Sequence, residues 1–162
     1  MARFGRLVAA RYRDGRVVKG WSEDFRAEGT HFHVLEDGRG LPTEIYVHDL
    51  KALFFIKSPE GKPGHRERKD FRYDGEVGRK TWIEFKDGEQ LAGWAGPLLF
   101  EDEGFYLLPT DPESNMEKVY VFRAQLRRVL HGDDAERAAR AYARANRTSP
   151  DAERWDQFLR VK

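Results

Sequence analysis

The sequence lacks several features that would place it in a functional class. It has no cysteine, so it can form no disulfide bond and offers no thiolate for catalysis or metal binding. No stretch approaches the roughly 20 consecutive apolar residues of a membrane-spanning helix. The motifs GxSxG, GxGxxG, HExxH and the P-loop are absent. We therefore expect no enzymatic activity, no cofactor and no membrane partner.

The N-terminal segment also lacks the apolar core of 7–15 residues that defines a signal peptide, because its short apolar run is typical of a first strand. We therefore expect a soluble, cytoplasmic protein.

The sequence also lacks an excess of charge of one sign. The chain carries 29 basic and 28 acidic residues, for a net charge of +1. The distribution is uneven, with a net charge of +2 for residues 1–57 and −4 for residues 81–131. A surface that binds polyanions needs a stronger basic excess. The opposite signs would help two parts of the chain to dock, or they reflect chance variation on solvated surfaces.

What the sequence does contain is an internal repeat. Residues 14–21 read DGRVVKGW and residues 87–94 read DGEQLAGW, an offset of 73 residues. The offset continues downstream, where Phe32 corresponds to Phe105. Asp-Gly between alternating apolar residues is typical of a β-hairpin with a type I′ turn. The repeat predicts one small β unit that occurs twice.

Period-two alternation around each hairpin predicts five short strands per unit, with a one-turn helix before the fifth. We expect a mainly β fold with two tandem five-stranded SH3-like or Sm-like barrels and a C-terminal helical tail. The expected parts are a first small barrel at 1–57, a linker at 58–79, a second small barrel at 80–132 and a tail at 133–162. The expected strands are 7–13, 16–24, 30–36, 44–48 and 52–57, then 80–85, 89–95, 104–108, 119–122 and 128–131, with one-turn helices at 49–51 and 125–127.

Three further expectations concern packing. Residues 53–56 read LFFI, apolar on both faces, so one face should fill the first barrel and the other should meet the second unit or a helix. The linker is rich in Gly, Pro and charge, which predicts exposure, with Phe71 and Tyr73 as anchors. In the tail, Asp133 or Asp134 would cap a helix that runs to about Asn146. A second helix would start at Ser149–Pro150 and pack through Trp155, Phe158 and Leu159.

Longer segments carry a family resemblance. KDGEQLAGW with FYLLPTDPESN, and HDLKALFFIKSPEG with GRKTWIEFKDG, resemble an uncharacterised bacterial domain family over residues 7–131. That family occurs alone and joined to PilZ signalling domains, which implies a bacterial regulatory or signalling context. The resemblance to Sm-like barrels implies RNA binding as rings, but no RNA-contacting Sm signature is present to carry this over.

Matching tryptophans and an arginine pair are the first candidate contacts. Trp21 and Trp94 each follow a glycine at equivalent positions, where exposed rings would hold a peptide or stack on bases. The alternative is that both rings pack against the neighbouring unit. Arg68 and Arg72 have the RxxxR spacing of a PilZ cyclic-di-GMP site, but the later DxSxxG motif is absent, so the spacing can be chance.

Histidines form a second candidate. His31 and His33 share one face of a strand, as two metal ligands would, with His48 or Asp49 as a third ligand. Exposed strand histidines are the simpler interpretation, and we expect no metal.

Arginines form a third candidate, at helical spacing in the tail. They would contact phosphates, or form a solvated face that pairs with Asp133 and Glu136. These residues are Arg137, Arg140, Arg144 and Arg147.

Together these observations predict a non-enzymatic binding or adaptor protein with a protein partner. The expected contact surface is the groove between the units, with Trp21, Trp94 and the basic linker. The alternatives are a nucleic-acid-binding protein, which would use the first unit, the linker and the tail arginines, and a sensor of a cyclic-di-GMP-type nucleotide. Nothing in the sequence determines the oligomeric state.

Overall fold

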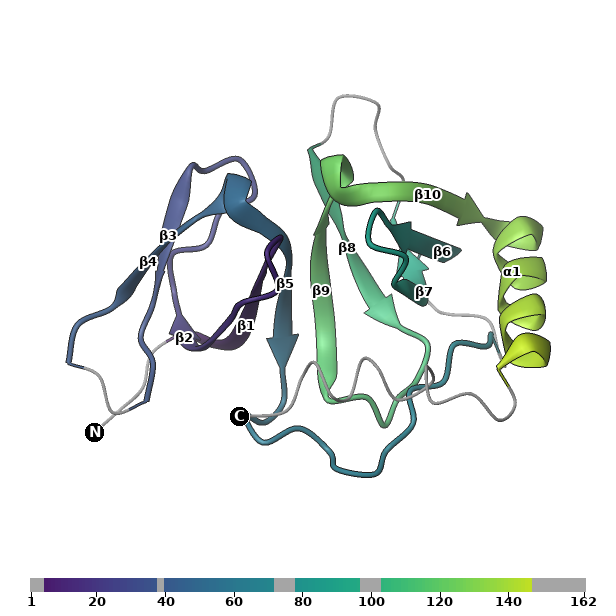
Figure 1. Cartoon of the computed structure of the whole chain (residues 1–162), viewed down its shortest axis with the longest axis horizontal. Coiled ribbons are helices and arrows are strands. Elements are labelled where there is room, and N and C mark those ends of the chain that lie inside the picture. Colours follow the sequence, from purple (N-terminus) through teal and green to yellow (C-terminus); the bar gives the residue numbers. More distant parts are fainter. Residues whose placement is uncertain (1–4, 38–39, 72–77, 97–102, 147–162) are drawn as a thin grey trace.

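The described residues of the computed structural model are 5–37, 40–71, 78–96 and 103–146. They form ten strands, two short 3-10 helices and one α-helix, so the mainly β prediction is confirmed (Figure 1). The first repeat comprises β1 (Arg6–Tyr12), β2 (Val17–Ser22), β3 (His31–Val34), β4 (Thr43–Tyr46), η1 (Val47–Asp49) and β5 (Leu50–Ile56). The second comprises β6 (Arg79–Phe85), β7 (Gln90–Ala95), β8 (Gly104–Pro109), β9 (Met116–Phe122), η2 (Arg123–Gln125) and β10 (Leu126–His131), followed by α1 (Gly132–Ala145).

Strand pairing repeats between the two halves. Eight strands form one antiparallel sheet in the order β10-β6-β7-β8-β9-β5-β1-β2, and β3 and β4 pair separately. A bridge from Trp21 to Leu35 attaches β3 to β2. Each repeat therefore follows the order fifth, first, second, third, fourth strand, as the internal repeat predicted.

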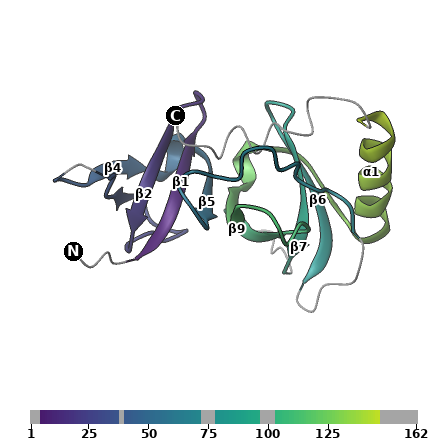
Figure 2. The ribbon, with the colours of Figure 1, turned by 90° about the horizontal axis from the view of Figure 1, so that it is seen from below.

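Closure into two barrels is not found. In the described residues no ladder joins the fourth strand of a repeat to its own fifth strand. Instead β9, the fourth strand of the second repeat, pairs with β5, the fifth strand of the first. The two repeats thus share one continuous sheet, and Figure 2 shows β5 and β9 side by side at the junction.

Both Asp-Gly hairpins form, but the predicted type I′ turn is wrong. No described non-glycine residue has a positive φ, whereas Gly15 and Gly88 have φ of 98° and 93°. Each hairpin has a three-residue loop, with Tyr12 N donating to Arg16 O at 2.9 Å in the first. Asp14 Oδ1 accepts the backbone N–H of Arg16 at 3.0 Å, which keeps the aspartate at negative φ and leaves the left-handed position to glycine. Asp87 does the same for the backbone N–H of Glu89.

The glycine before each repeated tryptophan has a steric reason. A Cβ on Gly20 would lie 2.3 Å from the carbonyl oxygen of Leu35, and a Cβ on Gly93 would lie 2.2 Å from that of Leu108. In both repeats the second strand meets the third at this point. Only a residue without a side chain permits so close a backbone approach.

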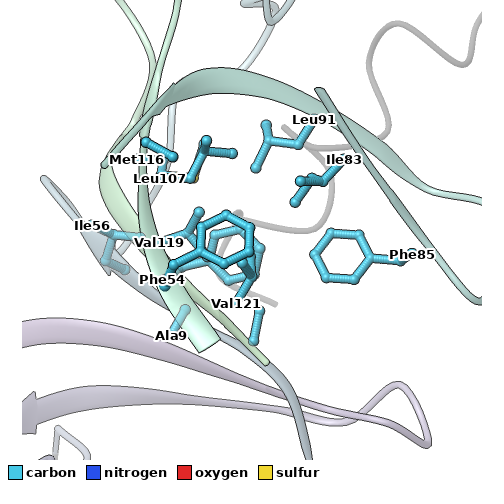
Figure 3. Packing of buried hydrophobic residues seen from close by; sticks show 13 residues of the cluster. Ala9, Phe54, Ile56, Ile83, Phe85, Leu91, Leu107, Met116, Val119 and Val121 are labelled. Atoms are coloured by element: carbon cyan, nitrogen blue, oxygen red, sulfur yellow. The ribbon is translucent and has the colours of Figure 1, made fainter. Parts of the chain in front are cut away.

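The central strands separate two hydrophobic cores. Phe54 and Ile56 of β5 and Val119 and Val121 of β9 face the core of the second repeat (Figure 3). The alternate residues of both strands face the core of the first repeat, as Leu53 does. The prediction that residues 53–56 are apolar on both faces because two cores meet there is confirmed.

Two predicted boundaries are wrong in the same way. The one-turn helices lie at Val47–Asp49 and Arg123–Gln125, two residues before the predicted positions in each repeat. Leu50 and Leu126 instead begin the fifth strands. Leu50 is buried in the first core and Leu126 packs against the second, so each leucine needs the extended backbone that a helical turn would remove.

The segment after β5 is not the exposed linker that its composition predicts. Glu67 and Lys69 are buried, because residues 58–71 lie along the second repeat. Phe71 is an anchor as predicted, with its ring centroid 5.4 Å from that of Trp94. Tyr73 lies outside the described residues.

Helix α1 covers β6 and β10 at the far end of the sheet (Figure 1). Ala135 and Ala139 are buried, and the Tyr142 ring lies 5.6 Å from that of Trp82. Helix α1 therefore packs on the second repeat, although its N-cap residue is His131, without a side-chain hydrogen bond. Asp133 and Asp134 lie inside the first turn, where their negative charges interact favourably with the positive end of the helix dipole. The second predicted tail helix lies outside the described residues.

Among the described helices, none has both the length and the apolar character needed to cross a membrane.

Candidate functional site

A groove of about 1000 Å³ opens where the ends of the two repeats meet. It is formed by equivalent parts of the repeats, because η1 lines one wall and η2 lines the other. Three apolar side chains form its buried surface, namely Val47, Leu50 and Phe122. Exposed Tyr46, at the end of β4, borders it.

The groove carries charges of both signs, with one more carboxylate than cation. Arg13 and Arg123 contribute cations, and Glu28, Asp49 and Glu103 contribute carboxylates. The backbone N–H of Arg13 donates to the carbonyl of Asp49 at 2.9 Å, which ties the first hairpin to η1. The groove thus offers side chains of both signs around an apolar surface.

The sequence predicted a groove between the repeats together with two tryptophans, but neither ring lines it. Trp21 and Trp94 are both half-buried and occupy equivalent strand positions. Trp94 packs edge-on against Phe71 of segment 58–71. Trp21 exchanges two backbone hydrogen bonds with Leu35.

Arg68 is also apart from the groove. Arg68 Nε lies 3.5 Å from an oxygen of Asp70, and the backbone N–H of Arg68 donates to Asp111 at 2.9 Å. Arg72, the other member of the RxxxR pair, lies outside the described residues.

The tail arginines form a largely solvated face. Arg137, Arg140 and Arg144 are exposed on α1, and Arg147 lies outside the described residues. Arg137 pairs with Asp134, one turn earlier. The predicted partner Glu136 instead accepts a hydrogen bond from Lys80 of β6 at 2.7 Å, because α1 packs on that strand.

The strand histidines do not assemble into a metal site. The rings of His31 and His33 lie 5.7 Å apart on β3, and His33 Nδ1 lies 2.7 Å from Asp24. His48 lines the groove with Asp49. Among the described residues these side chains do not bring three ligand atoms together.

A different polar cluster does bring three ligand atoms together. His65, Glu67 and Asp111 place one donor atom each within 4.8 Å of the other two. Burial raises the pKa of Glu67 to about 7, and the nearby Asp111 acts in the same direction. Burial would also raise the pKa of Asp111, but the backbone N–H groups of Arg68 and Glu113 outweigh it, and the pKa is lowered.

Ion pairs join the repeats at their interface. Lys51 Nζ lies 2.6 Å from Asp87 and 3.1 Å from Glu89, and the Glu89 side chain is buried. Arg11 Nη2 also reaches Glu89, at 3.5 Å. The expected attraction between oppositely charged units is thus realised locally. Because desolvation offsets such pairs, their net contribution to stability is small.

A family model covers most of the chain. The chain belongs to DUF6982, a family of unknown function. The family's sequence model matches residues 6–132. In this DUF6982 chain the match runs from the first residue of β1 to the first residue of α1, so the family unit contains both repeats. Neither a curated protein nor a solved structure matches the chain.

Sequence reasoning missed the cluster of His65, Glu67 and Asp111. His65 and Glu67 lie in the segment that its composition marked as an exposed linker, and Asp111 lies 44 positions beyond Glu67. One signal was available, since the turn that carries Asp111 is longer than its counterpart in the first repeat. Longer turns are where binding residues commonly occur.

Proposed function

We propose that this DUF6982 chain is a non-enzymatic adaptor that binds an extended polypeptide segment in the groove between its repeats. The observation that carries the proposal is the lining of that groove by equivalent elements, η1 and η2, around a buried apolar surface. Concave, partly apolar sites with a few polar groups are the usual form of a binding site.

The charges of the groove favour a polypeptide over a polyanion. Three carboxylates, from Glu28, Asp49 and Glu103, face a ligand there beside two arginines. A phosphate backbone would be repelled by these carboxylates, whereas a polypeptide can present charges of both signs.

An available strand edge supports the same ligand class. Within the described chain β4 pairs with β3 alone, and Tyr46 at its end borders the groove. Backbone N–H and C=O groups along such an edge can pair with an added strand. An extended segment that crosses the groove could therefore continue along β4.

We further propose that each repeat is an SH3-like or Sm-like unit in which the sheet curves round its own core. The repeated strand order supports this, as does the division of β5 and β9 between two cores. A rigid double unit of this kind is suited to presenting a binding surface, and its family context would be bacterial regulation or signalling.

Site-specific photocrosslinking tests the proposed function. A benzophenone amino acid replaces Ala124, which is exposed in the groove, and the variant is irradiated in the native cells. We expect discrete protein adducts that nuclease treatment does not change. A synthetic peptide spanning the crosslinked segment should then bind the purified chain, and Arg123→Glu should weaken that binding at least tenfold.

The matched control carries the same label at Ala143, which is exposed on α1 away from the groove. Equal adducts from both positions would show nonspecific capture and overturn the proposal. Adducts that disappear on nuclease treatment would favour the nucleic-acid alternative.

A further inference from the structure

Segment 58–71 crosses the turn after β8 and brings an imidazole and two carboxylates together. His65 Nε2 lies 2.9 Å from Asp111 Oδ2 and 3.6 Å from Glu67 Oε2. All three donor atoms lie within 4.8 Å of one another. None of these residues lines the groove, so the cluster is a separate site.

Two of the three separations are close to those of ligands on one metal ion. Zinc bonds imidazole nitrogen and carboxylate oxygen at about 2.0–2.2 Å, so two ligands at a tetrahedral ion lie about 3.3 Å apart. The observed 2.9 and 3.6 Å bracket this value. A small movement of the side chains would therefore seat an ion among them.

The backbone around the site holds the carboxylate of Asp111 in place. Asp111 Oδ2 accepts the N–H of Arg68 at 2.9 Å, and Oδ1 accepts the N–H of Glu113 at 2.9 Å. Asn115, which is buried, ties the same turn to Ser58 through its side chain at 2.9 and 3.0 Å. Hydrogen bonds that hold a ligand side chain and the turn that carries it orient the ligand and raise the affinity for the metal.

Burial and an oxygen without a hydrogen bond suit the cluster to a cation. The side chains of Glu67 and Asp111 are each 2% exposed. Oε1 of Glu67 is buried and makes no hydrogen bond to any described residue. Two carboxylates so close together and so far from water are costly unless positive charge compensates them. His65 is 20% exposed, which leaves a path from solvent to the site.

We propose that His65, Glu67 and Asp111 bind a divalent transition-metal ion, with Zn²⁺ as the best fit. The ion would replace the proton that the imidazole donates to Asp111, and the two carboxylates would balance its charge. Three protein ligands leave one position for water or a ligand atom. A bound metal ion would link residues 65–67 to the turn after β8 and so make segment 58–71 more rigid.

Metal titration of the full chain tests the proposal. After dialysis against EDTA, calorimetry with ZnCl₂ should give one ion per chain, and the thermal midpoint should rise with zinc and not with MgCl₂. Co²⁺ should give the visible absorption bands of a tetrahedral site. His65→Ala and Glu67→Gln should each weaken zinc binding at least tenfold and remove those bands.

A second histidine–carboxylate pair provides the matched control. His33 and Asp24 lie 2.7 Å apart, but both are exposed and lack a third ligand among the described residues. His33→Ala should leave zinc affinity unchanged. Absence of heat and of a midpoint shift at millimolar zinc would overturn the proposal, as would full zinc binding by folded His65→Ala. Peptide binding in the groove does not depend on either result.

Discussion

The fifth strands of the two repeats occupy equivalent places, yet their environments differ. Every residue of β5 is buried, whereas β10 is exposed or half-buried along its length. β5 lies between β9 and β1 with a core on each face, while β10 is the edge strand of the sheet. The sequences follow this difference, with LKALFFI in β5 and LRRVLH in β10. Position in the assembled sheet, rather than position in the repeat, determines how much apolar surface a strand needs.

The turns between the third and fourth strands differ as well. The offset between the repeats is 73 residues at the hairpins and 76 at the 3-10 helices, so the second repeat has three more residues between these two features. This longer stretch carries Asp111 and Asn115, which bind segment 58–71. In the first repeat the corresponding turn has Thr43 hydrogen-bonded to Glu36. The proposed metal site is thus a feature of the second repeat alone.

The largest expected effect tests the contrast between the fifth strands. Phe54→Ala should lower the free energy of unfolding by about 3–5 kcal/mol, because it opens a cavity in the core of the second repeat, to which β5 contributes. Leu130→Ala at the equivalent position of β10 should cost less, about 1–2 kcal/mol, because Leu130 is only partly buried. Urea denaturation measures both values.

The continuous sheet, in which β5 and β9 contribute to both cores, also predicts one cooperative transition for both repeats. Calorimetry of the wild-type chain should give a single unfolding peak. Two separate peaks, or equal losses for Phe54→Ala and Leu130→Ala, would contradict this coupling.

A prediction of intermediate size concerns a feature that both repeats have, the glycine before each repeated tryptophan. Gly20→Ala and Gly93→Ala should each destabilise the chain by about 1–3 kcal/mol, because the new methyl group meets a backbone carbonyl. Gly96→Ala is the control, since a Cβ there meets no atom of the described residues within 4 Å, and its effect should be below about 0.5 kcal/mol. If only one of the two equivalent glycines were sensitive, the repeats would not share this strand crossing.

The smallest effect concerns Lys19 of β2, whose equivalent in β7 is the buried Ala92. Burial lowers the pKa of Lys19 from 10.5 to about 8, against a smaller opposing effect of Glu60. The unfolded chain therefore binds more protons than the folded chain between about pH 8 and 10.5, and stability from this group rises with pH across that window. Below pH 8 the cost of the buried charge is fully present.

Lys19→Met should consequently be more stable than the wild type at pH 7, by less than about 1 kcal/mol because the half-buried amine is partly screened by solvent. The difference should shrink as pH approaches 10.5. Chemical denaturation at several pH values measures it. A difference that does not change with pH would mean that the lysine's charge carries no cost.

Much of the fold could be predicted because it depends on local patterns. The Asp-Gly hairpins and the alternating strands identify the repeat directly, and the LFFI segment of β5 predicts burial on both faces. The hairpin type was not predictable from Asp-Gly alone, because the Asp14 side chain holds its own backbone at negative φ. The one-turn helices were misplaced because Leu50 and Leu126 are drawn into strands by distant core residues.

The candidate sites were less predictable. The groove between the repeats was anticipated, but its residues come from segments far apart in the chain, and Trp21 and Trp94 are not among them. Likewise, no local pattern links His65 to Asp111. A site assembled across a sheet junction leaves little trace in the spacing of its residues.

By itself the sequence determined the duplicated order of strands, the two hairpins and the need to bury β5, because these follow from side-chain periodicity and from backbone preferences within a few residues. Only the tertiary structure decided that β5 joins β9, that segment 58–71 is packed rather than exposed, and which charges meet. Those outcomes depend on contacts between residues distant in sequence, where burial and electrostatics act through space rather than along the chain.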